Sequence, residues 1–213
     1  MDVACRCNRD HGLNVPREVA TGNRPSVATD EERDFEQLLE AMKKAAGVLN
    51  DAGIPFVLGG GLACWARGGP KTEHDVDLLV KPEDAEAAQR ALAHAGMRPE
   101  RPPEGWLLKA YADDVLIDLI FAPRGGTIDD EVFSRADDLE VHAMRLKVAP
   151  LEDVLVQKLL ALSEQNPDLS SVLELARSLR EQVNWDEVRE RTKESAFAKA
   201  YFTLLEELEI VPG

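Results

Sequence analysis

The sequence has only three cysteines, no long apolar run and few basic residues relative to acidic ones. No apolar stretch approaches the roughly 20 residues that a membrane-spanning helix needs, and the N-terminus lacks the long apolar segment of a signal peptide. We therefore expect a cytoplasmic protein with no membrane partner. Cys5, Cys7 and His11 match no standard zinc spacing and lack a fourth ligand, which argues against a zinc knuckle.

Lysine and arginine total 25 against 40 aspartates and glutamates, a formal net charge of −15. Contacts with phosphates need clustered Lys and Arg, so this shortage argues against a general nucleic-acid-binding surface. It leaves open an RNA, such as a tRNA end, held in a local basic cleft. The same field would attract a cationic substrate, for example an amino sugar, although a solvated acidic surface is the commoner reason for such a charge.

The pattern of apolar residues predicts an α+β fold in a chain of 213 residues that is 44% hydrophobic. Residues 1–28 lack apolar periodicity, which predicts a poorly ordered leader. A core over 29–149 begins at the capping-box signal of Thr29 and Glu32. Residues 150–213 predict a C-terminal helical subdomain. Within the core we expect helices over 29–49, 62–67 and 82–96, strands over 56–58, 74–80, 106–111, 115–121 and 141–148, and a loop over 123–130.

Three consecutive glycines, Gly59 to Gly61, separate the first strand from the helix that follows it. Glycine permits positive φ and close backbone approach, and the first N–H groups of a helix are unpaired, so the junction suits an anion such as a phosphate. Such turns are also common without any ligand.

Asp75 and Asp77 lie one residue apart in the next apolar strand. Side chains alternate along a strand, so both carboxylates share one face at roughly 7 Å between Cα atoms. Like charges in an apolar strand are costly unless a cation compensates them, and Mg²⁺ prefers such oxygen ligands. The alternative is an edge strand whose polar face meets water, because Asp-x-Asp arises often by chance in so acidic a chain.

Asp118 is the single charge in the strand predicted over 115–121. If that strand lies beside the strand of Asp75 and Asp77, the three carboxylates form a cage for two metal ions that bridge the phosphates of a nucleotide. The alternative is a strand with one solvated face.

Two lysines have ambiguous positions. Lys158 lies on the apolar stripe of the helix that begins at Pro150, so it either extends outward to water or points into a charged cleft. Lys109 alternates with apolar neighbours in its strand. It could reach a phosphate, but we expect it on a solvated sheet face.

Gly60-Gly61, then Asp75-x-Asp77 after a spacer of thirteen residues, then Asp118 in an apolar strand together resemble the nucleotidyltransferase superfamily, which has the DNA polymerase beta-like fold. The similarity covers roughly residues 31–165 and is greatest to small bacterial uncharacterised members and AbiEii-type toxin enzymes. It implies a mixed β-sheet flanked by helices. It also implies the site residues: Asp75 and Asp77 as metal ligands, Asp118 as a further ligand or the base, Gly60 and Gly61 as backbone contacts to the triphosphate, and Arg67, Lys71 and Lys158 as phosphate contacts.

Lys71 departs from the pattern, since many members carry an arginine there. Lysine keeps the charge but loses the bidentate fork.

The resemblance implies an enzyme that uses two Mg²⁺ ions to transfer a nucleoside monophosphate from an NTP, with ATP expected, to a hydroxyl, releasing pyrophosphate. The acceptor is left open between a small molecule, a tRNA and a protein. The alternative is a catalytically inactive binding or sensing module on the same fold, as part of a toxin and antitoxin pair.

Overall fold

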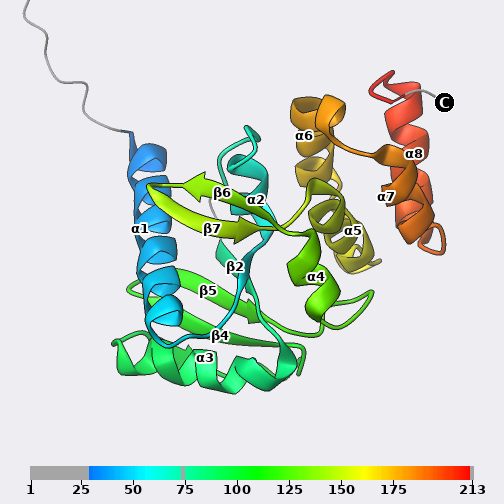
Figure 1. The fold of residues 1–213 in the computed structure, drawn as a ribbon. Helices are drawn as coiled ribbons and strands as arrows, with labels where there is room; N and C mark the ends of the chain where they lie inside the picture. Colours follow the sequence, from blue (N-terminus) through cyan, green and yellow to red (C-terminus); the bar gives the residue numbers. More distant parts are fainter. Residues whose placement is uncertain (1–28, 73–74, 212–213) are drawn as a thin grey trace, which may run out of the picture.

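A mixed seven-stranded sheet forms the centre of the protein in the computed structural model, which describes residues 29–72 and 75–211 (Figure 1). The strand order is β3-β4-β5-β2-β1-β7-β6. The strands are β1 (Val57–Leu58), β2 (Asp75–Leu79), β3 (Arg98–Glu100), β4 (Leu107–Ala112), β5 (Val115–Ile120), β6 (Asp137–Val141) and β7 (Met144–Val148). The predicted α+β class is confirmed. The predicted leader over 1–28, with Cys5, Cys7 and His11, lies outside the described residues.

Helices α1 (Asp30–Asp51) and α3 (Pro82–His94) pack against each other and against β5. The predicted capping box is present, because Thr29 Oγ1 accepts the Glu32 N–H at 3.2 Å and the Glu32 carboxylate accepts the Thr29 N–H at 2.9 Å. The apolar stripe of α1 is buried, as are Ala85, Ala88 and Leu92 of α3. Both helices therefore cover the sheet as their periodicity predicts.

Strand β2 lies in the middle of the sheet, between β5 and β1. It pairs in parallel with β5, where Asp77 is opposite Asp118, and antiparallel with β1. The short helix α2 (Gly60–Trp65) begins directly after β1. The strand, glycine turn and helix predicted from the sequence are thus present, and the two strands that carry aspartates are neighbours.

The single strand predicted over 141–148 is wrong. A hairpin occupies this region, with β6 and β7 joined by His142 and Ala143, whose φ angles are +47° and +61°. Two consecutive positive φ angles are typical of the two-residue hairpin turn. The sequence hides this turn because neither residue is the Asn or Gly that usually marks it.

Two further elements were not predicted, namely β3 and the short helix α4 (Asp130–Arg135). All three residues of β3 are exposed, and α4 has no buried residue. An element that buries nothing carries no apolar periodicity by which to find it.

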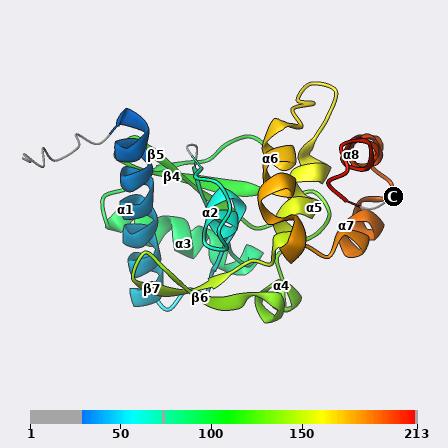
Figure 2. The ribbon, with the colours of Figure 1, turned by 90° about the horizontal axis from the view of Figure 1, so that it is seen from above.

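The C-terminal helices gather at one side of the sheet in both views (Figures 1 and 2). They are α5 (Leu151–Ala161), α6 (Ser170–Leu179), a 3₁₀ turn η1 (Arg180–Gln182), α7 (Trp185–Thr192) and α8 (Ala196–Glu207). Helix α5 contacts α2, and buried Tyr201 of α8 donates its hydroxyl to the Val172 carbonyl of α6 at 2.8 Å. Among the described residues no helix combines the length and apolarity required to cross a membrane.

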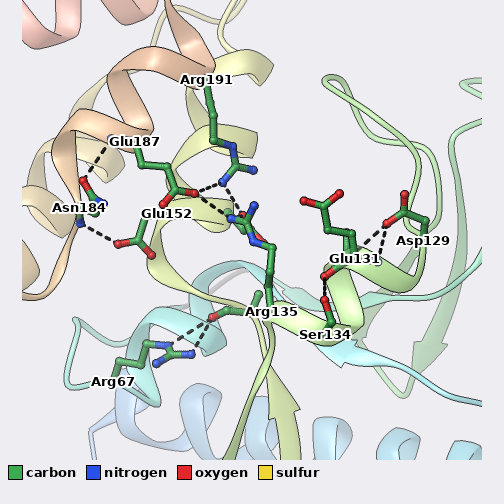
Figure 3. Close-up of polar contacts among 12 residues, drawn as sticks. Arg67, Asp129, Glu131, Ser134, Arg135, Glu152, Asn184, Glu187 and Arg191 are labelled. Atoms are coloured by element: carbon green, nitrogen blue, oxygen red, sulfur yellow. Dashed lines mark hydrogen bonds and ion pairs between the residues drawn. The ribbon is translucent and has the colours of Figure 1, made fainter.

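An ionic network joins α4 to the C-terminal helices (Figure 3). Arg135 of α4 and Arg191 of α7 both bond Asp153 of α5 and Glu187 of α7. A second tie is made by Glu152, which accepts the Asn184 N–H at 2.7 Å. These contacts join α5, which carries Lys158, to α4 and α7.

Candidate active site

Three carboxylates converge on one face of the neighbouring strands β2 and β5. Each of Asp75, Asp77 and Asp118 offers an oxygen that lies within 4.8 Å of the others. Asp118 is only 8% exposed, and the other two are half-buried. The in-register parallel pairing of β2 with β5 brings them together, because paired residues point to the same sheet face.

The negative charge of this carboxylate cluster is poorly compensated. Burial, together with the charges of Asp75 and Asp118, raises the pKa of Asp77 to about 7, although Lys158 and Lys109 act in the opposite direction. Burial also raises the pKa of Asp118, against the effect of Lys109. At neutral pH the cluster therefore favours either a proton or a cation.

Lys109 pairs directly with this cluster. Its Nζ donates to Asp118 Oδ1 at 3.1 Å, and its side chain is only 21% exposed. The expectation of a solvated sheet face is therefore wrong. Burial alone would lower the pKa of Lys109, but the hydrogen bond and charge of Asp118 raise it, so the lysine stays protonated.

The glycine turn is pressed against Asp77. The Gly59 N–H donates to the Asp77 carbonyl at 2.9 Å. Gly60 has a φ of +54°, and a Cβ added there would lie 1.6 Å from Asp77 Oδ2. A Cβ on Gly61 would lie 2.4 Å from Thr72 Oγ1. Only glycine allows the backbone this close to the carboxylate.

Two cavities share Lys158, and Asp77 lines one of them. The first, which we name the lysine cavity, has a volume of about 300 Å³ and is lined by Gly61, Lys71, Thr72, Lys158, Ser171 and Glu174, among others. The second, the tryptophan cavity, has a volume of about 310 Å³, and its lining includes Gly60, Asp77, Trp106, Arg124, Gln157 and Lys158. The carboxylate cluster thus borders the tryptophan cavity through Asp77, and Lys158 links that cavity to the lysine cavity.

The residues predicted to contact phosphate occupy different surroundings. Lys71 and Lys158 line the lysine cavity. The Arg67 guanidinium instead bonds Asp137 Oδ2 at 2.8 Å and the Val148 and Ala149 carbonyls at 3.2 and 3.1 Å. These bonds fix the junction of β7 and α5 (Figure 3). A phosphate contact by Arg67 stays a prediction.

Cys64 of α2 is a buried free thiol that packs as a small hydrophobe. Burial raises its pKa to about 11, so the thiol stays protonated and unreactive at neutral pH.

Three residues that line the tryptophan cavity were not singled out from the sequence: Trp106, Arg124 and Gln157. The sequence placed Trp106 in the strand predicted over 106–111 and Arg124 in the loop predicted over 123–130, with no functional role for either. Gln157 directly precedes Lys158, so the helix that carries the lysine could have indicated it.

The carboxylate cluster suits a hard divalent cation. Its donors are all carboxylate oxygens, the ligands that Mg²⁺ prefers, and among residues 29–72 and 75–211 no histidine or cysteine joins them to select a softer metal. The described residues hold one other possible ligand group, Glu36, Glu40 and His142, but both glutamates are exposed. Exposed acids are stable without a cation, whereas the partly buried acids on β2 and β5 need a cation or a proton to offset their repulsion.

Residues 3–209 match the family described as "Uncharacterised nucleotidyltransferase". No curated protein matches the chain. Among solved structures, the fold is similar to a crystal structure of ANT(2″)-Ia in complex with adenylyl-2″-tobramycin (TM-score 0.59, 15% identity), with 78% of this chain and 99% of that chain covered.

The solution structure of ANT(2″)-Ia gives a TM-score of 0.59 at 16% identity and covers 83% of this chain and 98% of that one. The lincomycin-bound lincosamide antibiotic adenylyltransferase LnuA gives 0.47 at 12% identity, with 71% and 98% covered. Identities this low establish the fold alone, whereas the family match spans nearly the whole chain. The chain therefore belongs to the uncharacterised nucleotidyltransferase family.

Proposed function

We propose that this protein transfers a nucleoside monophosphate from an NTP, with ATP as the donor, to a hydroxyl of an acceptor and releases pyrophosphate. One observation carries the proposal: oxygens of Asp75, Asp77 and Asp118 lie within 4.8 Å of one another on two paired strands. Family membership supports the NTP as substrate. The adenylyl group on the tobramycin bound to the similar ANT(2″)-Ia supports ATP.

Asp75, Asp77 and Asp118 would hold Mg²⁺, with two ions expected, and the metal would supply neutralisation of the carboxylates and polarisation of the α-phosphate. The donor set fits this role because it consists of oxygens alone.

The triphosphate would lie along the glycine turn and into the lysine cavity. Gly60 and Gly61 expose their backbone without side chains, and Lys71 and Lys158 add positive charge. Cations here would stabilise the charge that develops on the departing pyrophosphate.

In the reaction, the acceptor oxygen forms a bond to the α-phosphorus as the bond from that phosphorus to the bridging oxygen breaks. Pyrophosphate leaves with the electron pair, and the hydroxyl proton passes to Asp118 or to water. Lys109 holds the Asp118 carboxylate in place through its 3.1 Å hydrogen bond. Catalysis would come from positioning and charge stabilisation.

The test is transfer of label from α-labelled ATP to a cell extract in the presence of Mg²⁺. Asp77→Ala should abolish transfer, whereas the matched control Asp138→Ala, an exposed acid paired with Lys147, should retain it. A nucleotide-binding module without catalysis would instead bind ATP, show no transfer with the wild type and tolerate Asp118→Asn. Absence of labelled product from the folded wild type, with ATP bound, would reject the enzyme.

A further inference from the structure

The three tryptophans differ in how they are packed. Trp65 meets Phe35 edge-on at a centroid distance of 5.1 Å. Trp185 meets Phe202 at 6.4 Å and donates its indole N–H to the Arg180 carbonyl at 3.0 Å. Both pack against the hydrophobic core. Trp106 does not belong to that set and is 38% exposed.

The backbone of Trp106 is held in place at the end of β5. The Trp106 carbonyl accepts the N–H groups of Phe121 and Ala122, both at 3.1 Å. A large apolar side chain that extends from an anchored backbone and is not covered by the core leaves surface for a ligand.

Trp106 lines the same cavity as Asp77 and Gly60. The cavity, at about 310 Å³, is near the lower limit for small-molecule sites. Ile120, Pro123 and Val154 supply further apolar lining, while Gln157 supplies an amide. A ring with a flat apolar face and polar edges matches such a wall.

The lysine cavity carries the cationic side chains of Lys71 and Lys158 and the Thr72 hydroxyl, and so suits the phosphates of the donor. The tryptophan cavity then remains for the second substrate. Its lining includes Asp77, which is paired across the sheet with Asp118 of β5.

We propose that the acceptor is a small hydroxyl-bearing ring compound, a sugar or an aromatic alcohol, and that Trp106 binds it by stacking against the ring. This inference rests on the proposed nucleotidyl transfer. It selects a small molecule over a tRNA or a protein, since a cavity of this size encloses one ring.

The test uses α-labelled ATP and Mg²⁺ with a cell extract separated into a low-molecular-mass filtrate and a macromolecular retentate. Label should enter a compound of the filtrate. Trp106→Ala should raise the apparent KM for the filtrate, measured by dilution, by about tenfold, the size of effect that loss of one stacked ring produces. The KM for ATP should stay unchanged, and Trp106→Phe should restore most of the affinity for the filtrate.

Leu208→Ala is the matched control, because Leu208 is the other large exposed apolar side chain of the described residues, 42% exposed, and lies at the end of α8. Label on RNA or protein, or an unchanged filtrate KM in Trp106→Ala, would overturn the inference and leave nucleotidyl transfer standing. A rise in the KM for ATP alone would also overturn it, since Trp106 would then serve the donor. No label in either fraction with the wild type would instead reject the proposed function itself.

Discussion

Two clusters of carboxylates in this protein differ in how their charge is compensated. In the network of α4, α5 and α7, Asp153 and Glu187 face two arginines, and Arg191 lies 2.6 Å from Asp153 and 2.9 Å from Glu187 (Figure 3). In the carboxylate cluster of β2 and β5, Lys109 is the one cation bonded directly to any of the three aspartates within the part of the chain that the structure describes. The first cluster is complete within the protein, whereas the second has excess negative charge.

The pKa values follow this difference. Burial would lower the pKa of Arg191, but hydrogen bonds with Asp153 and Glu187 raise it, so this ion pair is maintained. The pKa of Asp77 rises to about 7 because burial and two neighbouring aspartates oppose its ionisation. The matched cluster, whose carboxylates are paired with arginines, stabilises the fold. The unmatched cluster, which has excess negative charge, favours the binding of a cation.

The largest expected effect is on the matched cluster. Asp153→Asn should lower the free energy of unfolding by about 3 kcal/mol, because Arg135 and Arg191 lose a carboxylate whose side chain is only 7% exposed. Urea denaturation measures the loss. Asp137→Asn removes the 60% exposed partner of Arg67 and should cost less than about 1 kcal/mol. Equal losses would show that burial of the network contributes nothing.

The corresponding Asp-to-Asn substitution in the unmatched cluster should raise the free energy of unfolding instead of lowering it. In EDTA near neutral pH, Asp77→Asn should raise the free energy of unfolding by about 2 kcal/mol, because it removes a repelled, desolvated charge. Excess Mg²⁺ should remove the advantage, since the ion stabilises only the protein that binds it well. Urea midpoints of Asp77→Asn and the wild type, measured with EDTA and with Mg²⁺, test both expectations. A variant less stable than the wild type in EDTA would contradict the difference between the two clusters.

The raised pKa of Asp77 also predicts that the stability of the metal-free protein depends on pH. The folded protein holds a proton on Asp77 up to about pH 7, whereas the unfolded chain loses it near the ordinary value of 3.8. Metal-free wild type should therefore lose stability relative to Asp77→Asn as pH rises between these values, with no further change above them. Urea midpoints of both proteins across this range test the slope; a constant difference would mean an ordinary Asp77 pKa.

The smallest expected effect concerns Lys109, the lysine that is hydrogen-bonded to Asp118. Lys109→Met removes the cation that lowers the pKa of Asp118, so nucleotidyl transfer at neutral pH should fall by about tenfold and recover at higher pH. The pH profile of label transfer measures this shift. Lys147→Met is the control and should leave the pH profile unchanged. Lys147 forms an ion pair with Asp138, and their side chains are 41% and 52% exposed.

Much of the site could be predicted from the sequence because its members interrupt strong patterns. Asp75 and Asp77 alternate with apolar residues, and Asp118 is the single charge of its strand. Both strands are buried and highly apolar, so their existence and faces follow from side-chain alternation. The structure confirms that the strands are neighbours and that the carboxylates converge.

The Lys109–Asp118 pair was missed because it depends on the register of a hairpin. The turn consists of Asp113 and Asp114 alone, so Ala112 pairs with Val115, and counting back places Lys109 opposite Asp118. The strands predicted over 106–111 and 115–121 leave a connecting turn of three residues, and a turn of that length gives a different register. Trp106 was missed for another reason: only the assembled cavity distinguishes an uncovered aromatic side chain from a core one.

The register of β2 and β5 also bears on when the carboxylate cluster can assemble during synthesis of the chain. Asp77 and Asp118 face each other only when two strands separated by α3, β3 and β4 have paired, and a slip by one residue would turn Asp118 to the other side of the sheet. A chain emerging from the ribosome carries Asp75 and Asp77 well before it carries their third partner. If the three carboxylates hold Mg²⁺ as proposed, the nascent chain should not bind the ion until this non-local pairing is complete, and ion binding would then mark the native topology.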